Sequence, residues 1–176
     1  MMPASVPLTR DLVLIGGGHA HALVLRMWGM DPLPGARLTV IDPNPVAPYT
    51  GMLPGLVAGH YRREELEIDL VRLARFAGAR LIVGAVTGID AGAGRVTVAG
   101  RGEIGFDVAS VDVGIHSGMP RVPGFSEHGV AAKPLGPFAG AWEAFLGRVA
   151  QGATPQAAVI GGGIAGIELA MAMAYR

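Results

Sequence analysis

Apolar residues gather along the chain in short continuous runs, and most of these runs end in glycine. The first run, residues 11–15, leads directly into the glycine triplet 16–18. A continuous apolar run of this length is typical of a strand that is buried on both faces, as in a parallel sheet. The proline-free apolar stretch 20–30 predicts a helix, and residues 37–41 predict a second strand. This order of strand, glycine turn, helix and strand predicts a βαβ unit.

The middle of the chain predicts shorter and more mixed elements. Residues 43–59 are rich in proline and glycine and predict an irregular loop, which at this length is usually functional. A following amphipathic helix that ends near Gly78 is indicated by apolar residues at helical spacing, namely Leu66, Leu70, Leu73 and Ala77. Further short strands, including an antiparallel excursion, are predicted at residues 80–86, 95–99, 105–110 and 109–113.

The last third of the chain repeats the opening pattern. Residues 118–137 contain four prolines and predict an irregular connection, and residues 138–150 can form a helix. A second apolar run, residues 157–160, then predicts a strand that ends in another glycine triplet and opens a helix. The sequence stops at Arg176 before another strand completes this unit. We therefore expect a fragment of a longer protein, or a last element that packs against something else.

These elements predict an α/β fold with a Rossmann-like parallel sheet, a small antiparallel excursion and a second, truncated Rossmann unit. The pattern predicts a first nucleotide-binding domain at residues 1–117. A connection with its helix follows at residues 118–150, and a second nucleotide-binding domain begins at residues 151–176.

Composition and charge exclude several classes of function. Fourteen basic and fourteen acidic residues cancel, so no nucleic-acid partner is indicated. The 176 residues contain no cysteine, which excludes a disulfide scaffold and a thiolate metal site within them. No histidine or carboxylate spacing suggests another metal site. No apolar run approaches the roughly 18 residues of a membrane-spanning helix, and the N-terminus does not resemble a signal peptide, so we expect a cytoplasmic protein.

The first glycine turn has the pattern Gly16-x-Gly18-x-x-His21. In a dinucleotide-binding turn the first glycine permits the sharp bend, and the second lets the backbone approach a pyrophosphate that binds at the helix N-terminus. The third position normally holds glycine or alanine, and here it holds His21. Asp42 follows the second strand, where an acid binds a ribose hydroxyl, although at 26 residues from Gly16 it lies beyond the usual spacing of about 20. A purely structural glycine turn is the alternative.

The second glycine turn, Gly161-x-Gly163-x-x-Gly166, has the complete pattern, and Glu168 follows in the predicted helix. Glu168 is interpreted either as a group near a nicotinamide or as a solvated acid favoured by the helix dipole. Two such motifs in one chain indicate a flavin dinucleotide and a nicotinamide dinucleotide that meet for hydride transfer.

With both motifs the sequence resembles the pyridine nucleotide-disulfide oxidoreductase superfamily over nearly its whole length. The resemblance implies that the first motif binds FAD and the second binds NAD(P)H. Residues 106–114 resemble the family strand that leads into an Ala-Thr-Gly turn, but the turn here reads Asp112-Val113-Gly114. Residues 80–90 resemble the strand whose backbone contacts adenine, near Val86.

Residues 16–26 and 48–54 also resemble one subgroup, which lies close to type-II NADH dehydrogenases and sulfide:quinone oxidoreductases. It includes the flavoprotein extension of selenophosphate synthases. A histidine at position 21 is part of its pattern, and the turn Asp112-Val113-Gly114 also fits it. The resemblance implies that residues 48–54 pass the flavin. The cofactor-binding residues expected from motif and resemblance together are Gly16, Gly17, Gly18, His19, Ala20, Asp42, Pro43, Tyr49, Thr50, Met52, Val86, Val113, Gly114, Gly161, Gly163, Gly166 and Glu168.

The expected function is an FAD-dependent oxidoreductase that passes hydride from NAD(P)H to FAD. Disulfide reductases of this family carry their cysteine pair in the first flavin segment, which here has none, so the expected acceptor is a small molecule such as a quinone. No catalytic side chain is required by this chemistry. The alternatives are a non-catalytic flavin- or nucleotide-binding module or an inactive fragment of such an enzyme. Peripheral membrane contact and a homodimer are further expectations for the full-length protein.

Overall fold

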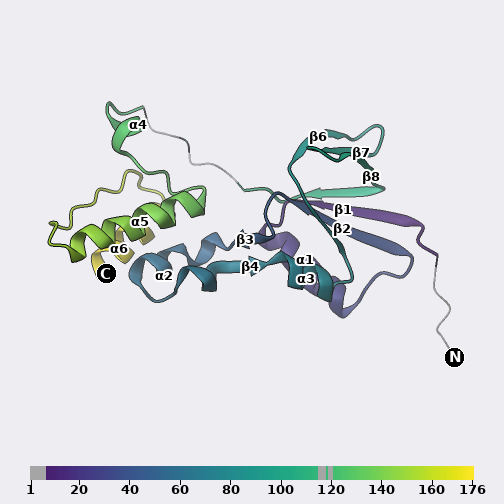
Figure 1. Cartoon of the computed structure of the whole chain (residues 1–176), viewed down its shortest axis with the longest axis horizontal. Coiled ribbons are helices and arrows are strands. Elements are labelled where there is room, and N and C mark those ends of the chain that lie inside the picture. Colours follow the sequence, from purple (N-terminus) through teal and green to yellow (C-terminus); the bar gives the residue numbers. More distant parts are fainter. Residues whose placement is uncertain (1–6, 115–117, 119–120) are drawn as a thin grey trace. The chain divides into compact units, whose positions relative to one another are not determined.

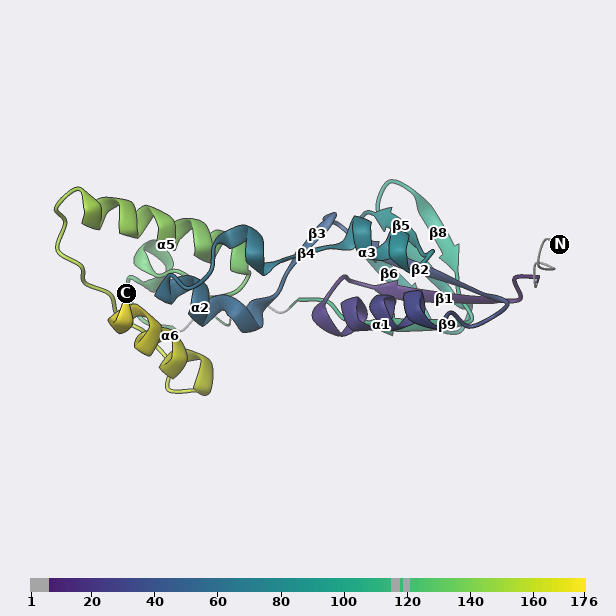
Figure 2. The ribbon, with the colours of Figure 1, turned by 90° about the horizontal axis from the view of Figure 1, so that it is seen from below.

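The computed structural model describes residues 7–114, 118 and 121–176. The chain divides into two compact units. The first unit comprises the described residues up to Ala47 together with Ile68–Gly114. The second comprises Pro48–Glu67 and the described residues after Gly114. Figures 1 and 2 show the elements of each unit along the chain.

The first unit is built on a parallel four-stranded sheet in the order β5-β2-β1-β9. Its strands are β1 (Arg10–Ile15), β2 (Ala36–Asp42), β5 (Arg80–Val83) and β9 (Val108–Val111). Leu14 of β1 pairs with Val40 on one side and Ser110 on the other. Strand order therefore reverses at β1, with β2 to one side and β9 to the other. Ligands of open α/β sheets bind at such a switch point, outside the carboxyl ends of the strands.

Two helices cover one face of this sheet, α1 (His19–Met30) and α3 (Leu70–Phe76) (Figure 1). The core between helices and sheet consists of buried aliphatic side chains, namely Leu14, Leu25, Leu38, Val40, Ala74 and Ala77. The predicted βαβ unit is thus confirmed, with α1 connecting two adjacent parallel strands.

A three-stranded antiparallel sheet covers the other face, formed by β6 (Val86–Asp90), β7 (Arg95–Val98) and β8 (Gly102–Gly105). Its apolar contacts with the parallel sheet include Val13, Ile15, Ile41, Ile82, Val96 and Val98. The antiparallel excursion is confirmed, but two predicted strands are each divided between the sheets. Residues 80–86 separate into β5 and β6 at a turn, and residues 105–110 separate into β8 and β9.

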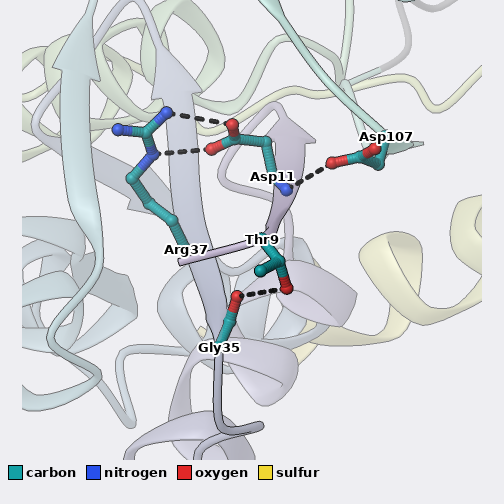
Figure 3. A network of polar contacts seen from close by, with 5 residues as sticks. All are labelled: Thr9, Asp11, Gly35, Arg37 and Asp107. Carbon is teal, nitrogen blue, oxygen red and sulfur yellow. Dashed lines mark hydrogen bonds and ion pairs between the residues drawn. The ribbon is translucent and has the colours of Figure 1, made fainter. Parts of the chain in front are cut away.

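Polar contacts join the amino ends of β1 and β2 and the residue before β9 (Figure 3). The Arg37 guanidinium donates to both carboxylate oxygens of Asp11, at 2.6 and 3.0 Å. The pKa of Arg37 is raised, first by this hydrogen bond and then by the charge of Asp11. The backbone N–H of Asp11 donates to Asp107 over 2.7 Å, and the Thr9 hydroxyl donates to the Gly35 carbonyl oxygen over 3.5 Å. This network lies at the amino ends of these strands, and the glycine turn lies at their carboxyl ends.

The prediction of an irregular loop at residues 43–59 is wrong. This segment contains β3 (Val46–Pro48), the 3-10 helix η1 (Thr50–Met52) and α2 (Leu53–Ala58). Leu53 and Val57 of α2 are buried in the core of the second unit, which explains why a stretch rich in proline and glycine is ordered. Pro54 is compatible with this helix because a proline in the first turn replaces an N–H that has no intrahelical partner.

The prediction of one helix from Leu66 to Gly78 is wrong at its beginning. The segment starts with η2 (Arg63–Leu66), continues with β4 (Glu67–Asp69), which pairs with β3, and becomes helical only at Leu70. Asp69 sets this boundary, because its carboxylate accepts a hydrogen bond of 2.9 Å from the backbone N–H of Arg72 and so caps α3. Leu66 is buried, but in the core of the second unit.

The second unit is helical, with α2, α4 (Phe125–His128), α5 (Leu135–Ala150) and α6 (Ile164–Tyr175). Its core consists of buried side chains from α2, η2, α5 and α6, namely Leu53, Val57, Ala58, Leu66, Leu135, Phe138, Trp142, Leu169 and Ala172. The helices predicted at 138–150 and after Gly163 are confirmed. The first begins three residues earlier than expected, and α4 lies within the connection that was predicted to be irregular. Across the described residues, no helix is both long and apolar enough to cross a bilayer.

The strand predicted at residues 157–160 is not formed. In the described part of the chain these residues belong to no sheet, and Ile160 is 59% exposed. A parallel strand needs a neighbour to satisfy its backbone N–H and carbonyl groups. The described residues of the second unit offer none, so an apolar run that is typical of a buried strand remains unpaired.

Candidate functional site

The first glycine turn connects β1 to α1 at the switch point of the parallel sheet. Gly16 has a φ of +89°, which disfavours any residue with a side chain, and a Cβ there would contact the Asp112 carbonyl oxygen. A Cβ on Gly17 would contact the Leu70 side chain, and a Cβ on Gly18 would contact the Asp112 carboxylate. Gly16 is therefore required by its backbone conformation and a backbone contact, whereas a Cβ at Gly17 or Gly18 would displace a neighbouring side chain.

Asp42 points from the end of β2 to this turn. Its Oδ2 atom accepts a hydrogen bond of 2.7 Å from the backbone N–H of Gly17, and its Oδ1 atom accepts one of 2.8 Å from the N–H of Asn44. The predicted acid thus lies beside the predicted glycine turn. A carboxylate can accept about four hydrogen bonds, so Asp42 keeps capacity for further donors such as ribose hydroxyls.

Asp112, which follows β9, contacts the same turn from the other side. Its carbonyl oxygen accepts a hydrogen bond from Gly18 N–H over 3.3 Å, and its Oδ2 atom accepts one of 3.0 Å from the backbone N–H of His21. His21 is the third residue of α1, so the carboxylate lies at the helix N-terminus, where the helix dipole favours a negative charge. In sequence Asp112 was notable only as a departure from the family turn, although an acid directly after an apolar strand is a signal that could have identified it.

His21 is buried, with 2% of its surface exposed. Its Nδ1 atom lies 2.7 Å from the Gly16 carbonyl oxygen, and its Nε2 atom lies 2.8 Å from the Ser110 hydroxyl. Because a carbonyl oxygen only accepts, we assign the proton to Nδ1, and in the neutral ring Nε2 accepts from Ser110. Ser110 was not singled out by sequence reasoning, because only the pairing of β1 with β9 brings it to the histidine.

The other predicted residues of the first unit lie in the first turn of α1, directly after β2 and β9, and at the start of β6. His19 and Ala20 are exposed in the first turn of α1, and Pro43 is exposed directly after β2. Val113 and Gly114 are exposed after β9. Val86 is half-buried at the start of β6, just after Gly84, whose N–H donates to the Asp42 carbonyl oxygen over 2.9 Å.

The remaining predicted residues belong to the second unit. Tyr49 precedes η1, and Thr50 and Met52 are its first and last residues. Gly161 and Gly163 are exposed in the turn before α6, and Glu168 is exposed on that helix.

Within the second glycine motif, the third glycine has a clear structural reason. A Cβ on Gly166 would contact the Gly161 carbonyl oxygen, so only glycine allows α6 to pack this closely on its own turn. Gly161 has a φ of +132°, which also favours glycine. Both ends of this motif therefore require glycine.

The fold resembles those of several solved oxidoreductase structures. The chain superimposes on the NAD-dependent persulfide reductase from A. fulgidus with a TM-score of 0.72 and 24% identity, covering 94% of this chain and 32% of that one. The sulfide:quinone oxidoreductase from Aquifex aeolicus gives a TM-score of 0.62 at 20% identity, covering 82% and 33%. The water-forming NADH oxidase from Lactobacillus brevis, bound to NADH, gives 0.69 at 22% identity, covering 95% and 38%.

The chain thus spans about a third of the length of these structures. A search among curated proteins found no match. The sequence model of the family described as pyridine nucleotide-disulphide oxidoreductase matches residues 10–175, which is nearly the whole chain. Together with the parallel sheet and its glycine turn at the switch point, this match shows that the chain belongs to the pyridine nucleotide-disulphide oxidoreductase family.

Proposed function

We propose that this chain is part of an FAD-dependent oxidoreductase that passes hydride from NAD(P)H to FAD and electrons on to a non-disulfide acceptor. The observation that carries the proposal is the first glycine turn, with the Asp42 carboxylate bonded to Gly17 N–H over 2.7 Å at the carboxyl edge of the sheet. This arrangement of glycine turn, helix N-terminus and acid is the one that binds the pyrophosphate and ribose of a dinucleotide.

The residues of the first unit fit an adenine dinucleotide in two respects. In the first turn of α1, the backbone N–H of His21 donates to an anionic oxygen, that of Asp112, so the N–H groups at this helix end suit an anion. Asp42 keeps acceptor capacity for ribose hydroxyls. We assign the pyrophosphate to Gly16, Gly17, Gly18 and the following first turn of α1, the ribose to Asp42, and the adenine to the backbone near Val86.

FAD, when bound, supplies an acceptor for hydride and a store for two electrons. The role of this chain is then to bind and orient. In the second unit, the glycines of the second motif would hold the phosphates of NAD(P)H at the N-terminus of α6, and Glu168 would lie toward the nicotinamide. The resemblance alone assigns flavin contacts to Tyr49, Thr50 and Met52.

The class of electron acceptor is proposed from the absence of cysteine in this sequence. No cysteine occurs among the 176 residues, so this stretch offers no dithiol to receive electrons. A quinone or another small molecule is consistent with this composition. The likeness of residues 16–26 and 48–54 to a subgroup close to type-II NADH dehydrogenases and sulfide:quinone oxidoreductases supports the same class of acceptor.

A non-catalytic nucleotide-binding module is the second candidate. One observation favours it: residues 157–160 pair with no strand in the described part of the chain, so the second motif has no sheet behind it. A chain of this kind would bind flavin without oxidising a nicotinamide.

The test is reconstitution of the purified chain with FAD, followed by gel filtration and an absorption spectrum between 350 and 500 nm (roughly the flavin bands). Co-elution of flavin absorbance with protein supports the site, and a colourless protein peak contradicts it. Anaerobic addition of NADH and, separately, NADPH then discriminates between the two candidates. Bleaching of the bound flavin supports the oxidoreductase, whereas a persistent yellow colour favours the binding module.

A further inference from the structure

We propose that Asp112 is a specificity-determining residue of the dinucleotide site, because its carboxylate is a resident anion at the N-terminus of α1 and opposes phosphate-bearing ligands there. The inference rests on the proposed function, since it concerns the same site. It names a residue and an electrostatic role that neither the glycine motif nor the fold assigns.

Two departures from the general pattern of the superfamily, both of which fit the narrower subgroup, meet at this point. The third position of the glycine motif holds His21, and the turn after β9 holds Asp112 where the family pattern has alanine. In the structure, the backbone N–H of His21 donates to Asp112 Oδ2 over 3.0 Å. The carboxylate also fills the space that a Cβ on Gly18 would occupy.

The helix itself supplies no such charge. The first turn of α1 contains no acidic residue, and its N-cap, Gly18, has no side chain. Asp112 therefore provides from β9 the negative charge that helix N-termini favour. Asp42 has a different role. Its carboxylate oxygens accept from the backbone N–H groups of Gly17 and Asn44, and it stands at the position of the acid that binds a ribose.

A pyrophosphate at the same helix end carries charge of the same sign. Two like charges a few ångströms apart at a partly buried site repel each other more strongly than in bulk water. Asp112 thus weakens binding of every ligand that places phosphate on this turn and leaves the adenosine part unaffected. Removing the charge while keeping an acceptor for His21 N–H should strengthen phosphate binding.

Asp112→Asn makes this change, because its amide oxygen can still accept from the His21 N–H. Asp112→Ser is a second neutral variant with a shorter acceptor. Asp107→Asn is the matched control: it removes a carboxylate at the opposite end of β9, where Asp107 accepts from Asp11 N–H over 2.7 Å. Calorimetric titration of the full chain with FAD, ADP and adenosine measures the affinities, and thermal melting shows that each variant is folded.

We expect Asp112→Asn to bind ADP and FAD about tenfold more tightly than the unchanged chain, and adenosine equally well. Asp107→Asn should leave all three affinities within about twofold. The salt dependence of the same two proteins adds to this: raising NaCl screens the repulsion, so ADP binding to the unchanged chain should weaken less with salt than ADP binding to Asp112→Asn.

The outcomes separate this inference from the proposed function. If the unchanged chain binds FAD but Asp112→Asn binds ADP no more tightly, or more weakly, the role of Asp112 is overturned and the dinucleotide site stands. If neither the unchanged chain nor any variant binds FAD or ADP, the proposed function fails and this inference fails with it. If only the neutral variants bind, the role of Asp112 is supported, but FAD binding by the unchanged chain, which the proposed function requires, is contradicted.

Discussion

The Nε2 atom of His21 lies 2.8 Å from the hydroxyl of Ser110, so the third residue of the glycine motif joins α1 to β9. Glycine or alanine at this position allows helix and strand to pack closely. Here a buried imidazole fills the space and replaces close packing with hydrogen bonds to Ser110 and to the Gly16 carbonyl oxygen. This side chain therefore holds the turn in addition to the backbone contacts that Gly16 and Gly18 make with Asp112.

Ser110→Ala should destabilise the chain by about 1–2 kcal/mol, because it leaves a buried ring nitrogen without its donor. His21→Ala should cost about 2–4 kcal/mol, since it removes both hydrogen bonds and leaves a cavity. Urea denaturation followed by far-UV circular dichroism measures both. Ser126→Ala, on exposed α4, is the control and should change stability by less than about 0.5 kcal/mol. Equal stabilities for Ser110→Ala and Ser126→Ala would contradict the role of this hydrogen bond.

Gly18→Ala tests the approach of Asp112 to the glycine turn. The backbone of Gly18, with a φ of −58°, accepts alanine without strain, so any cost comes from the collision of the new Cβ with the Asp112 carboxylate. We expect a loss of about 1–3 kcal/mol in the unchanged background. In an Asp112→Ala background the same substitution should cost at least about 1 kcal/mol less.

Gly114→Ala is the control for this cycle, because nothing lies within 4 Å of its added Cβ. It should leave stability within about 0.5 kcal/mol. Additive effects of Gly18→Ala and Asp112→Ala would show that the two positions are not in contact.

Asp42→Asn should reduce both stability and flavin retention. The carboxylate accepts from two backbone N–H groups, and an amide offers one oxygen and places an N–H against the other donor, at a cost of about 1–3 kcal/mol. Asp90→Asn is the matched control, because Asp90 accepts a turn hydrogen bond of 2.8 Å from Ala93 N–H, and asparagine keeps an oxygen that can accept it. Denaturation and FAD titration measure the two effects, and an unchanged FAD affinity in Asp42→Asn would exclude the ribose role.

Substitution of glycine by alanine in the helices of the second unit should raise stability at some positions and lower it at another. Gly140 and Gly147 lie within α5 with nothing within 4 Å of an added Cβ, so alanine at either should stabilise by about 0.5–1 kcal/mol. Gly166→Ala should destabilise, because its Cβ would contact the Gly161 carbonyl oxygen. Thermal melting of the three variants measures the contrast. A rise in melting temperature for Gly166→Ala would contradict the packing of the second glycine motif.

The local pattern of apolar residues and glycine was enough to predict the first strands and the first helix. Runs of apolar residues predict β1 and β2, and the glycine triplet before an apolar, proline-free stretch predicts α1. Burial on both faces requires a continuous apolar strand, and a sharp turn requires glycine, so both requirements can be read from neighbouring residues. The same reasoning placed Asp42 beside the turn.

Other features depend on partners that are distant in sequence. Residues 43–59 are ordered because Leu53 and Val57 are buried in a core with α5 and α6, and residues 157–160 remain unpaired because no described strand lies beside them. Neither outcome can be derived from local composition, since burial and strand pairing are properties of the whole fold.

The glycine motif by itself determined where a phosphate-binding turn would form. Only the tertiary structure brought Ser110 and Asp112 to it, 89 and 91 residues from His21 along the chain, because β9 pairs with β1 and ends at the same edge. A hydrogen bond or a like-charge repulsion acts over a few ångströms in space, and sequence separation carries no information about that distance until strand order is fixed.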